Sequence, residues 1–484
     1  MEQTSDIKRK TIIGSAWQLA QKLSSQIVGL FVGIVLARLL SPNDYGLVAI
    51  TSIFISVAGV FANSGLGSSL VQKKDIDLLD CDTVFWAGLG ISFIIFSLLF
   101  ISAPIIANIY KEAQLIWIIR AQSVSLLFSS FSSVQNSLVL RKLDFKKFFY
   151  RSLISTSISG IIGLGMAFAG FGVWALIGHS FSSTIVGIII LQRIVHWWPS
   201  LHFSIVRLKK LWSFGLNLMG ANLFGTFFNE LRGFLIGIHY TPSDLAYCNR
   251  GTSIPKLFDD NIRGTISSVL FPAISRLQDN PENVKISIRR SMMTTTFLIA
   301  PTMMLLSATS EQIILLVYSS KWAFAIPFMQ VICFQYLFSI VGETNLQAMN
   351  AIGRSDITLK LEFVKKPLYL VILLYTMTIS PLAMTIGSAV YAIIAGAINA
   401  TPNKRLINYS YWEQIRDVAP QVLLALFVGI IVFIIGKWQA NIILVLLLQT
   451  ICGLILYFSI SYIFRFESMK YLTRSILEMR KKSL

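Results

Sequence analysis

The stretch NLMGANLFGTFFNELRGFLIGIHYTPSDLAYCNRGTSIPKLFDDNIRGTISSVLFPAISRLQ, residues 217–278, decides how this chain folds. It predicts two long apolar helices joined by a turn at residues 241–244, yet ionisable side chains occur along both helices. An ionisable residue at the middle of a bilayer costs about 2.5–3.5 kcal/mol even on lenient insertion scales. We therefore expect these side chains to face protein or a water-filled cavity, which makes this stretch the first candidate for a functional site.

One face of the second predicted helix is polar over its whole length. Side chains that recur every three or four positions fall on one stripe of an α-helix. This stripe holds Asn249, Ser253, Lys256, Asp260, Arg263 and Ser267, with Asp259 at its edge. The spacing also suits intrahelical ion pairs, of Lys256 with Asp260 and of Asp259 or Asp260 with Arg263. A structural role and a binding role are both compatible with this pattern.

The composition of the whole chain is that of a polytopic membrane protein. Of its 484 residues, 55% are hydrophobic and 13% are charged, whereas a soluble protein has about 25% charged residues. Apolar runs long enough to cross a bilayer recur from end to end and predict about 14 spans. We expect an all-α fold with two six-helix lobes related as parallel repeats, followed by two C-terminal helices.

Basic residues are concentrated in alternate connections, on the same side of the membrane as the N-terminus. An even number of spans puts both termini on that side, and the positive-inside rule makes it the cytoplasm. Lys360, Lys365 and Lys366 are assigned to one of these cytoplasmic connections. The net charge of +18 is then explained mostly by topology and by anionic lipid headgroups, and we do not read it as nucleic-acid binding.

A short motif recurs two hundred positions apart in the chain. The tetrapeptide SPND at residues 41–44 returns as TPSD at residues 241–244, with Gly33 and Gly233 in register. We interpret this as an internal repeat, although Pro-x-Asp is also common turn chemistry. The predicted domains are an N-lobe over residues 1–195, a C-lobe over residues 196–411, and two helices with a cytoplasmic tail over residues 412–484.

Further polar side chains lie inside other predicted spans. They are Lys22, Arg120, Asn229, Glu230, Arg232 and Glu343. The interior cations of the chain are five: Lys22, Arg120, Arg232, Lys256 and Arg263. Together they would cost roughly 12–18 kcal/mol if they faced lipid. A hydrated cationic cavity between the two halves explains them at once, and snorkelling to the interface remains the alternative for Lys22 and Arg120.

A cationic cavity suits an anionic substrate. Pyrophosphate is a good candidate, because Lys and Arg recognise phosphate oxygens through charge-assisted hydrogen bonds. The predicted substrate-binding residues are Lys22, Arg120, Arg232, Lys256, Arg263, Asn229 and Asn249. The predicted residues for a coupling proton or sodium ion, or for charge balance, are Glu230, Asp259, Asp260 and Glu343.

The sequence contains no recognisable catalytic motif. The four histidines and four cysteines show no ligand spacing, so neither a metal site nor a disulfide framework is predicted. The glycines form no nucleotide-binding loop after a strand. We predict a transporter rather than an enzyme, without a cofactor.

Several motifs of the first 278 residues resemble the Wzx-type polysaccharide flippases of the WzxC and polysaccharide-transport group. They are LARLLSPNDYG at residues 36–46, GLG at 65–67, LVQ at 70–72, FGVWAL at 171–176, YCNR at 247–250, LFPA at 270–273 and SRLQ at 275–278. The resemblance implies the fold of the multidrug/oligosaccharidyl-lipid/polysaccharide superfamily. It also implies that an undecaprenyl-pyrophosphate-linked oligosaccharide crosses the bacterial inner membrane by alternating access, to form O-antigen, capsule or exopolysaccharide.

Two positions depart from the family pattern. Glu230-Leu231-Arg232 stands where Asn-x-Asp is expected, and Asn63 stands where an Asp is expected. Ion coupling through those family acids is therefore not carried over to this chain. The partners implied are the lipid-linked oligosaccharide, anionic lipids at the cytoplasmic face, a polysaccharide polymerase and a chain-length regulator, and no nucleic acid.

Three alternatives remain at this point. A flippase for the lipid-linked peptidoglycan precursor and a cation-coupled drug exporter would share the fold. A drug exporter is expected to need fewer interior cations. A membrane polysaccharide polymerase or ligase is an alternative of another class, and it is expected to have a sizeable external loop with catalytic Arg or His.

Overall fold

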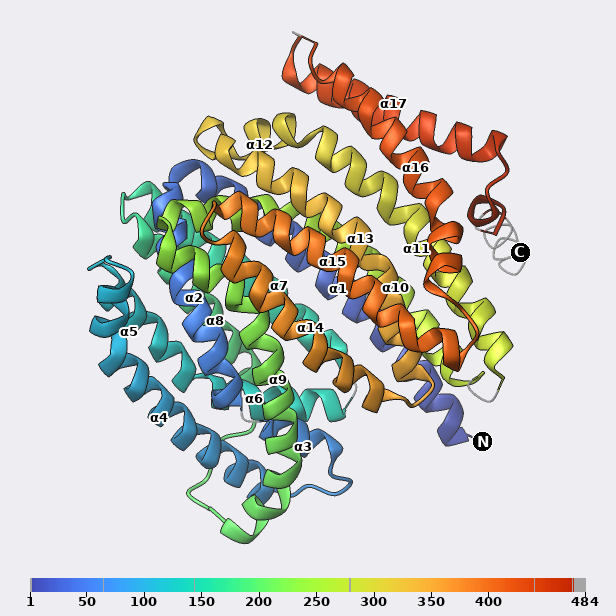
Figure 1. Cartoon of the computed structure of the whole chain (residues 1–484). Helices are drawn as coiled ribbons and strands as arrows, with labels where there is room; N and C mark the ends of the chain where they lie inside the picture. Colours follow the sequence, from blue (N-terminus) through green and yellow to red (C-terminus); the bar gives the residue numbers. More distant parts are fainter. Residues whose placement is uncertain are drawn as a thin grey trace. The chain divides into compact units, whose positions relative to one another are not determined.

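The computed structural model describes residues 2–63, 65–142, 144–277, 280–438, 440–471 and 473. These residues form long α-helices, and the described chain contains no strand (Figure 1). The helices of the first half are α1 Glu2–Leu39, α2 Pro42–Asn63, α3 Leu66–Gln72, α4 Leu78–Ile109, α5 Leu115–Leu127, α6 Ser129–Arg141, α7 Phe145–Phe168, α8 Val173–Val195 and α9 Ile205–His239. Those of the second half are α10 Pro242–Ser275, α11 Pro281–Ala308, α12 Ser310–Tyr318, the 3₁₀ helix η1 Ser320–Ala325, α13 Ile326–Ala351, α14 Ser355–Thr376, α15 Pro381–Leu406, α16 Tyr411–Ile435 and α17 Ile442–Ile463.

Eleven segments of the described chain are long and apolar enough to cross a membrane. Helices α9, α10 and α14 are equally long but carry more polar or charged residues. Helices α9 and α10 follow one another between the qualifying α8 and α11, and α14 lies in sequence between the qualifying α13 and α15, so we count all three as spans. Together these segments make the expected 14, and the predicted all-α polytopic fold is confirmed.

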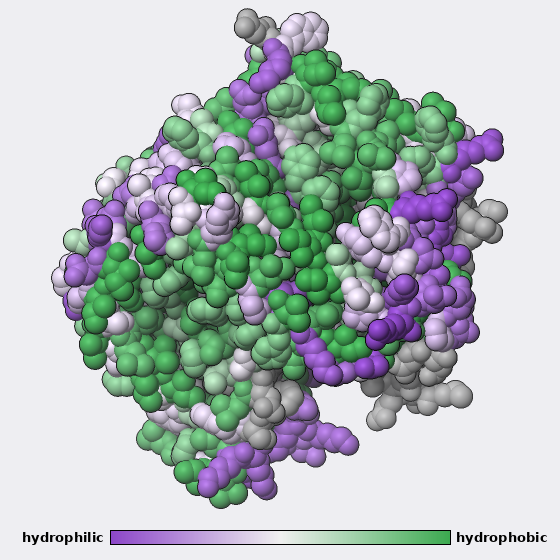
Figure 2. Space-filling view, in the orientation of Figure 1, coloured by the Kyte–Doolittle hydropathy of each residue, from purple (hydrophilic) through white to green (hydrophobic). Residues whose placement is uncertain are grey.

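Large parts of the surface of the described chain are apolar. Figure 2 shows broad hydrophobic areas on the visible face, with hydrophilic side chains gathered into patches. Ile27, Ile101 and Ile161 are each about 70% exposed although they lie in the middle of long helices. Exposed apolar patches of this extent mark interaction or membrane surfaces, and here they mark the lipid-facing sides of the helices.

The chain divides into two compact units, Met1–Ala246 and Tyr247–Leu484. In the first unit, α7 packs on α1 and α8, α2 packs on α5 and α9, and α4 packs on α5. In the second unit, α13 packs on α11 and α15, α16 packs on α11 and α17, and α14 packs on α15. The lobe boundaries predicted at residues 195 and 411 stay a prediction.

The repeated tetrapeptides form the same turn at the starts of α2 and α10. The hydroxyl of Ser41 donates to Oδ2 of Asp44 over 2.6 Å, and the Asp44 amide donates back to Ser41 Oγ over 3.2 Å. The hydroxyl of Thr241 donates to Asp244 over 2.7 Å, with the same 3.2 Å return bond. Each motif is thus a reciprocal helix cap, which satisfies backbone groups that a helix start leaves open.

A buried amide network holds three helices of the second unit together. Asn345 of α13 donates to Gln414 of α16 over 2.6 Å and accepts a bond of 3.1 Å from it. Asn403 of α15 donates to the same Asn345 carbonyl oxygen over 2.5 Å. All three side chains are fully buried, so each needs the others to satisfy its amide groups.

Candidate functional site

The polar stripe of α10 meets polar side chains of α13 in the second unit. Nη2 of Arg263 on α10 donates to Ser339 Oγ on α13 over 2.7 Å, and Nη1 donates to Glu343 Oε2 over 2.7 Å. One turn further along, Gln347 of α13 donates to Ser267 Oγ of α10 over 2.6 Å. Polar residues that the sequence places on separate helices therefore form one continuous contact.

Arg263 is the centre of this contact and uses every nitrogen of its guanidinium. Nε donates to Asp259 Oδ1 over 2.5 Å, one turn back on the same helix, and Nη2 also reaches the carbonyl oxygen of Tyr336 over 2.7 Å. The side chains of Arg263 and Asp259 are 11% and 6% exposed, whereas that of Glu343 is 50% exposed. The predicted pairing of Asp259 with Arg263 is confirmed, and Glu343 is the partner that solvent reaches.

The charges of this cluster do not balance. One guanidinium faces the two carboxylates of Asp259 and Glu343, which leaves one formal negative charge in excess. An anion can bind Arg263 here only if it displaces a carboxylate or if a cation neutralises one. Whether an anion can bind Arg263 therefore depends on whether Asp259 or Glu343 is neutralised or displaced.

The backbone of α10 lies close to its neighbours at Gly251. A Cβ atom built there would lie 2.8 Å from the carbonyl oxygen of Ala325 and from the amide nitrogen of Met329, at the start of α13. Only a residue without a side chain allows this approach. Further along α10, the long side chains of Arg263 and Gln347 make the connection to α13.

The other predicted residues of α10 share its polar stripe but are exposed. Asn249, Lys256 and Asp260 are exposed, and the described contacts of Lys256 include no ion pair with Asp260. The pairing that the spacing allowed for these two residues is thus not formed. Their side chains remain accessible to a polar ligand.

The predicted residues of the first unit lie in different surroundings. Lys22 is exposed on α1, and Asn229 is exposed on α9. Arg120 of α5 donates to the Phe100 carbonyl oxygen over 3.3 Å, and its guanidinium lies 4.5 Å from the centre of the Phe100 ring. This packing against α4 accounts for Arg120 without a substrate.

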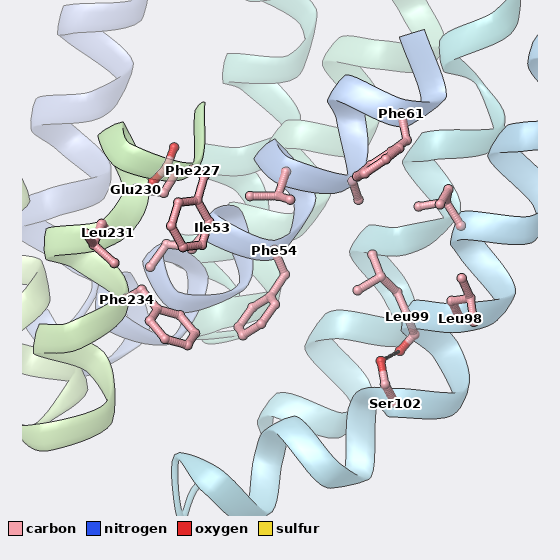
Figure 3. A pocket seen from close by; sticks show the side chains of 13 residues that line it. Ile53, Phe54, Phe61, Leu98, Leu99, Ser102, Phe227, Glu230, Leu231 and Phe234 are labelled. Atoms are coloured by element: carbon pink, nitrogen blue, oxygen red, sulfur yellow. Dashed lines mark hydrogen bonds between the residues drawn. The ribbon is translucent and has the colours of Figure 1, made fainter. Parts of the chain in front are cut away.

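Glu230 faces a largely apolar cavity of about 330 Å³ between α2, α4 and α9. Figure 3 shows aromatic rings, including Phe54 and Phe234, around this space. Among the described residues that line it, Glu230 is the only ionisable one, and Arg232 on the same helix is half-buried. The walls of this cavity are suited to apolar groups and not to pyrophosphate.

A charged cluster on α14 escaped the sequence prediction. Lys365 and Lys366 were assigned to a cytoplasmic connection, but α14 begins at Ser355 and includes both. Their ammonium groups lie 2.5 Å and 3.5 Å from the carboxylate of Glu362. Glu362 is spaced i, i+3 and i, i+4 from these lysines, which is the spacing of intrahelical ion pairs. This pattern could have predicted the cluster, but the lysines were counted only as basic residues of a cytoplasmic connection.

The helices and their buried charged contacts define a polytopic α-helical membrane protein that holds ionic side chains inside its spans. The family model described as Polysaccharide biosynthesis protein matches residues 35–327, which is more than half of the chain. The chain therefore belongs to this polysaccharide biosynthesis protein family.

Two relatives and one solved structure illustrate the relationship. The chain is 28% identical over 330 residues to the succinoglycan biosynthesis transport protein ExoT of Rhizobium meliloti, a match that covers 67% of this chain and 66% of that protein. It is 23% identical over 432 residues to the lipopolysaccharide biosynthesis protein WzxC of Escherichia coli, covering 85% and 82%. The predicted resemblance to Wzx-type polysaccharide flippases, and with it a transporter rather than an enzyme, is confirmed.

The fold is shared with the lipid II flippase MurJ in its inward closed conformation. The two structures align with a TM-score of 0.75 at 16% sequence identity, over 93% of this chain and 98% of that one. At this level of identity the likeness shows the fold alone.

Proposed function

We propose that this chain is a flippase that moves undecaprenyl-pyrophosphate-linked oligosaccharide repeat units from the cytoplasmic to the periplasmic leaflet. The observation that carries the proposal is the contact of Arg263 with Asp259 and Glu343 inside the membrane-spanning part of the second unit. Ion pairs at such depth are costly and mark pathways for polar substrates. The names of ExoT and WzxC support the class of sugar substrate, and that of MurJ supports a lipid carrier.

In the proposed mechanism, the pyrophosphate of the substrate competes with the two carboxylates for Arg263. A proton or sodium ion that neutralises Glu343, the more exposed carboxylate, weakens its hold on the guanidinium. Phosphate oxygens then accept the hydrogen bonds that the carboxylate gave up. Binding of the coupling cation and of the anionic substrate therefore favour one another, as thermodynamic linkage requires.

The substrate head would cross by alternating access, while its polyprenyl tail stays in lipid. Lys256 and Asn249, which are exposed on α10, are proposed as further contacts for the pyrophosphate and sugar. Lys22, Asn229 and Arg232 on α1 and α9 are kept as proposed contacts for the substrate within the first unit, and Glu230 and Asp260 are kept as groups that balance charge in their own units. Two states that differ in exposure of one site suffice for such transport, and no bond has to break.

The proposed location is the bacterial inner membrane, with both termini in the cytoplasm. The concentration of basic residues on one side of the spans supports this orientation and contact with anionic lipids. A polysaccharide polymerase and a chain-length regulator are proposed as partners, because the translocated repeat units have to be joined outside the membrane.

The test is translocation of a fluorescent undecaprenyl-pyrophosphate oligosaccharide in proteoliposomes, with and without a pH or sodium gradient. Lys256→Ala/Arg263→Ala is compared with Lys360→Ala/Arg405→Ala, which removes two exposed cations elsewhere in the same unit. We expect gradient-dependent translocation by the wild type and the control, and a rate lower by about tenfold or more in the first variant. Lys256→Ala alone is included, because loss of Arg263 leaves Asp259 buried without its partner.

Two results would contradict the proposal. Unchanged translocation by a folded Lys256→Ala/Arg263→Ala protein would remove the cationic site from the mechanism. A wild type that moves no lipid-linked oligosaccharide under either gradient, but exports drugs or transfers sugars instead, would place the chain in another functional class.

A further inference from the structure

A polar pocket of about 220 Å³ lies where α11 meets the segment that follows α17, within the second unit. Arg290, Met293 and Thr294 of α11 form one wall. The other wall is formed by Glu467, Ser468, Lys470 and Tyr471. None of these residues belongs to the candidate substrate site, so the pocket needs an explanation of its own.

Three hydrogen bonds connect the two walls of this pocket to the helices around them. Arg289, which precedes Arg290 on α11, donates from Nη1 to Oε1 of Glu467 over 3.0 Å and from Nη2 to Oε2 over 2.9 Å. Gln421 of α16 donates to Ser468 Oγ over 2.8 Å, and both of these side chains are buried. The walls are thus fixed in place without the help of the cations inside the pocket.

The two cations that line the pocket have no acidic partner in the described part of the chain. Both carboxylate oxygens of Glu467 accept hydrogen bonds from Arg289, and no described carboxylate lies at ion-pair distance from Arg290 or Lys470. The guanidinium of Arg290 lies 5.9 Å from the centre of the Tyr471 ring, a cation–π contact that leaves its N–H groups available. Both cations are exposed, so a ligand can reach them.

The charges at this pocket favour an anion. Arg289, Arg290 and Lys470 carry three formal positive charges. Asp417 and Glu467, which both accept hydrogen bonds from Arg289, carry two negative charges. Further hydrogen-bond donors in the pocket are the hydroxyl groups of Thr294, Ser468 and Tyr471. Phosphate oxygens accept bonds from such cations and hydroxyl groups, so the lining suits a phosphate group.

Both walls place the pocket at a boundary of the membrane. In α11, Arg290 is followed by eighteen residues without a charged side chain, up to Ala308. At about 1.5 Å per residue they extend about 27 Å, close to the roughly 30 Å of a hydrocarbon core. The other wall begins at Glu467, four residues after the apolar span α17 ends at Ile463. The pocket therefore lies at the depth of phospholipid headgroups.

We propose that this pocket binds the phosphate of an anionic phospholipid headgroup, which Arg290 contacts from one wall and Lys470 from the other. Arginine holds phosphate oxygens with paired N–H groups, and lysine adds a compact charge. Ile463 and Phe464, just before the second wall, are 70% and 72% exposed and offer apolar surface to the acyl chains. In the orientation proposed above, the lipid belongs to the cytoplasmic leaflet.

The inference goes beyond the proposed function and holds whichever substrate the chain moves. A soluble phosphate compound would satisfy the same donors, but it gains nothing from the depth of the pocket or from the apolar side chains beside it. A zwitterionic headgroup also carries a phosphate, yet its ammonium group adds a positive charge next to Arg290 and Lys470. An anionic lipid is the ligand that fits both the charge and the position.

Basic residues at a membrane boundary also attract anionic lipids without forming a site, and the chain offers a matched control for this effect. Lys404 and Arg405 are exposed at the end of α15. Helix α16 begins a few residues later, and its Glu413 lies 3.7 Å from Lys285 of α11. The control pair is therefore on the same side of the membrane, outside the pocket, and its removal changes the net charge equally.

The experiment uses native mass spectrometry of the full chain, released from neutral detergent micelles, to measure the affinity for the first bound phosphatidylglycerol. Arg290→Gln/Lys470→Gln is compared with Lys404→Gln/Arg405→Gln and with the charge-preserving Arg290→Lys/Lys470→Arg. We expect affinity about tenfold lower in the first variant, because each cation near a lipid surface contributes about 1 kcal/mol. The other two variants are expected to bind like the wild type, and thermal unfolding shows that each is folded.

Three results would overturn the inference. Equal affinities of folded Arg290→Gln/Lys470→Gln and of Lys404→Gln/Arg405→Gln would show general attraction instead of a site. Phosphatidylcholine that binds the wild type as tightly as phosphatidylglycerol would show that the charge of the headgroup is not recognised. Displacement of phosphatidylglycerol by equal concentrations of glycerol 3-phosphate or inorganic phosphate would assign the pocket to a soluble phosphate compound. Each of these results leaves the translocation test of the proposed function unaffected.

Discussion

Glu343 Oε2 accepts a hydrogen bond of 2.7 Å from Arg263 Nη1, which ties α13 to α10 across 80 positions of the chain. The guanidinium is almost buried while the carboxylate is half exposed, so Glu343 is the partner that a coupling ion reaches first. This asymmetry makes Glu343 the residue whose change should affect coupling more than folding.

Glu343→Gln is expected to uncouple transport from the ion gradient. The amide keeps the shape of the side chain but removes the negative charge, so Arg263 becomes available to an anion without a cation. Pyrophosphate affinity should rise about tenfold, and translocation should respond less to pH or sodium. Glu311 is an exposed acid of α12, and Glu311→Gln is the matched control. If translocation depended on the gradient equally in both variants, Glu343 would be excluded from coupling.

Gly46→Ala is expected to destabilise the first unit. A Cβ at this position would overlap the backbone carbonyl of Pro242, which cannot move aside as a flexible side chain could. We expect a loss of roughly 1–3 kcal/mol, as for other overpacked sites. Gly59→Ala in the same helix is the control, because its Cβ would meet no atom within 4 Å. The measurement is thermal unfolding of both variants in detergent. If Gly59→Ala were the less stable variant, the close approach at Gly46 would be contradicted.

Asp44→Ala and Asp244→Ala are expected to cost similar amounts of stability. Each removes the acceptor of a reciprocal helix cap with nearly the same hydrogen-bond lengths, and loss of such a cap costs about 1 kcal/mol. Asn43→Ala and Ser243→Ala, which change a neighbouring position of each turn, serve as controls. The measurement is the stability of each variant in chemical denaturation. If one Asp variant were as stable as its control, the two turns would not be equivalent.

Asn345→Leu is expected to destabilise the second unit strongly. It leaves the buried amides of Gln414 and Asn403 without their common partner, at a cost of about 1–3 kcal/mol for each unsatisfied group. Asn350→Leu at the exposed end of the same helix should cost much less, because its bond with Thr358 is exposed to solvent. A smaller loss in Asn345→Leu than in Asn350→Leu, in thermal unfolding, would disprove the network's role.

The sequence by itself determined the class of fold and much of the local structure. Hydrophobic runs set the long helices, since in a bilayer only a helix can satisfy all backbone groups within one segment. The periodicity of polar residues placed Asp260, Arg263 and Ser267 on one stripe of α10. The spacing of Asp259 and Arg263 likewise predicted their ion pair, because helix geometry alone brings positions i and i+4 together.

Only the tertiary structure decided which stripes face each other and how their charges add up. Arg263 meets Glu343 through packing of two helices distant in sequence, and no local rule fixes that pairing. The count of partners around Arg263 turned a predicted cationic site into one with an excess carboxylate. The physical reason is that the sign and strength of a buried site depend on the summed charges and solvent access around it, which arise only when separate helices come together.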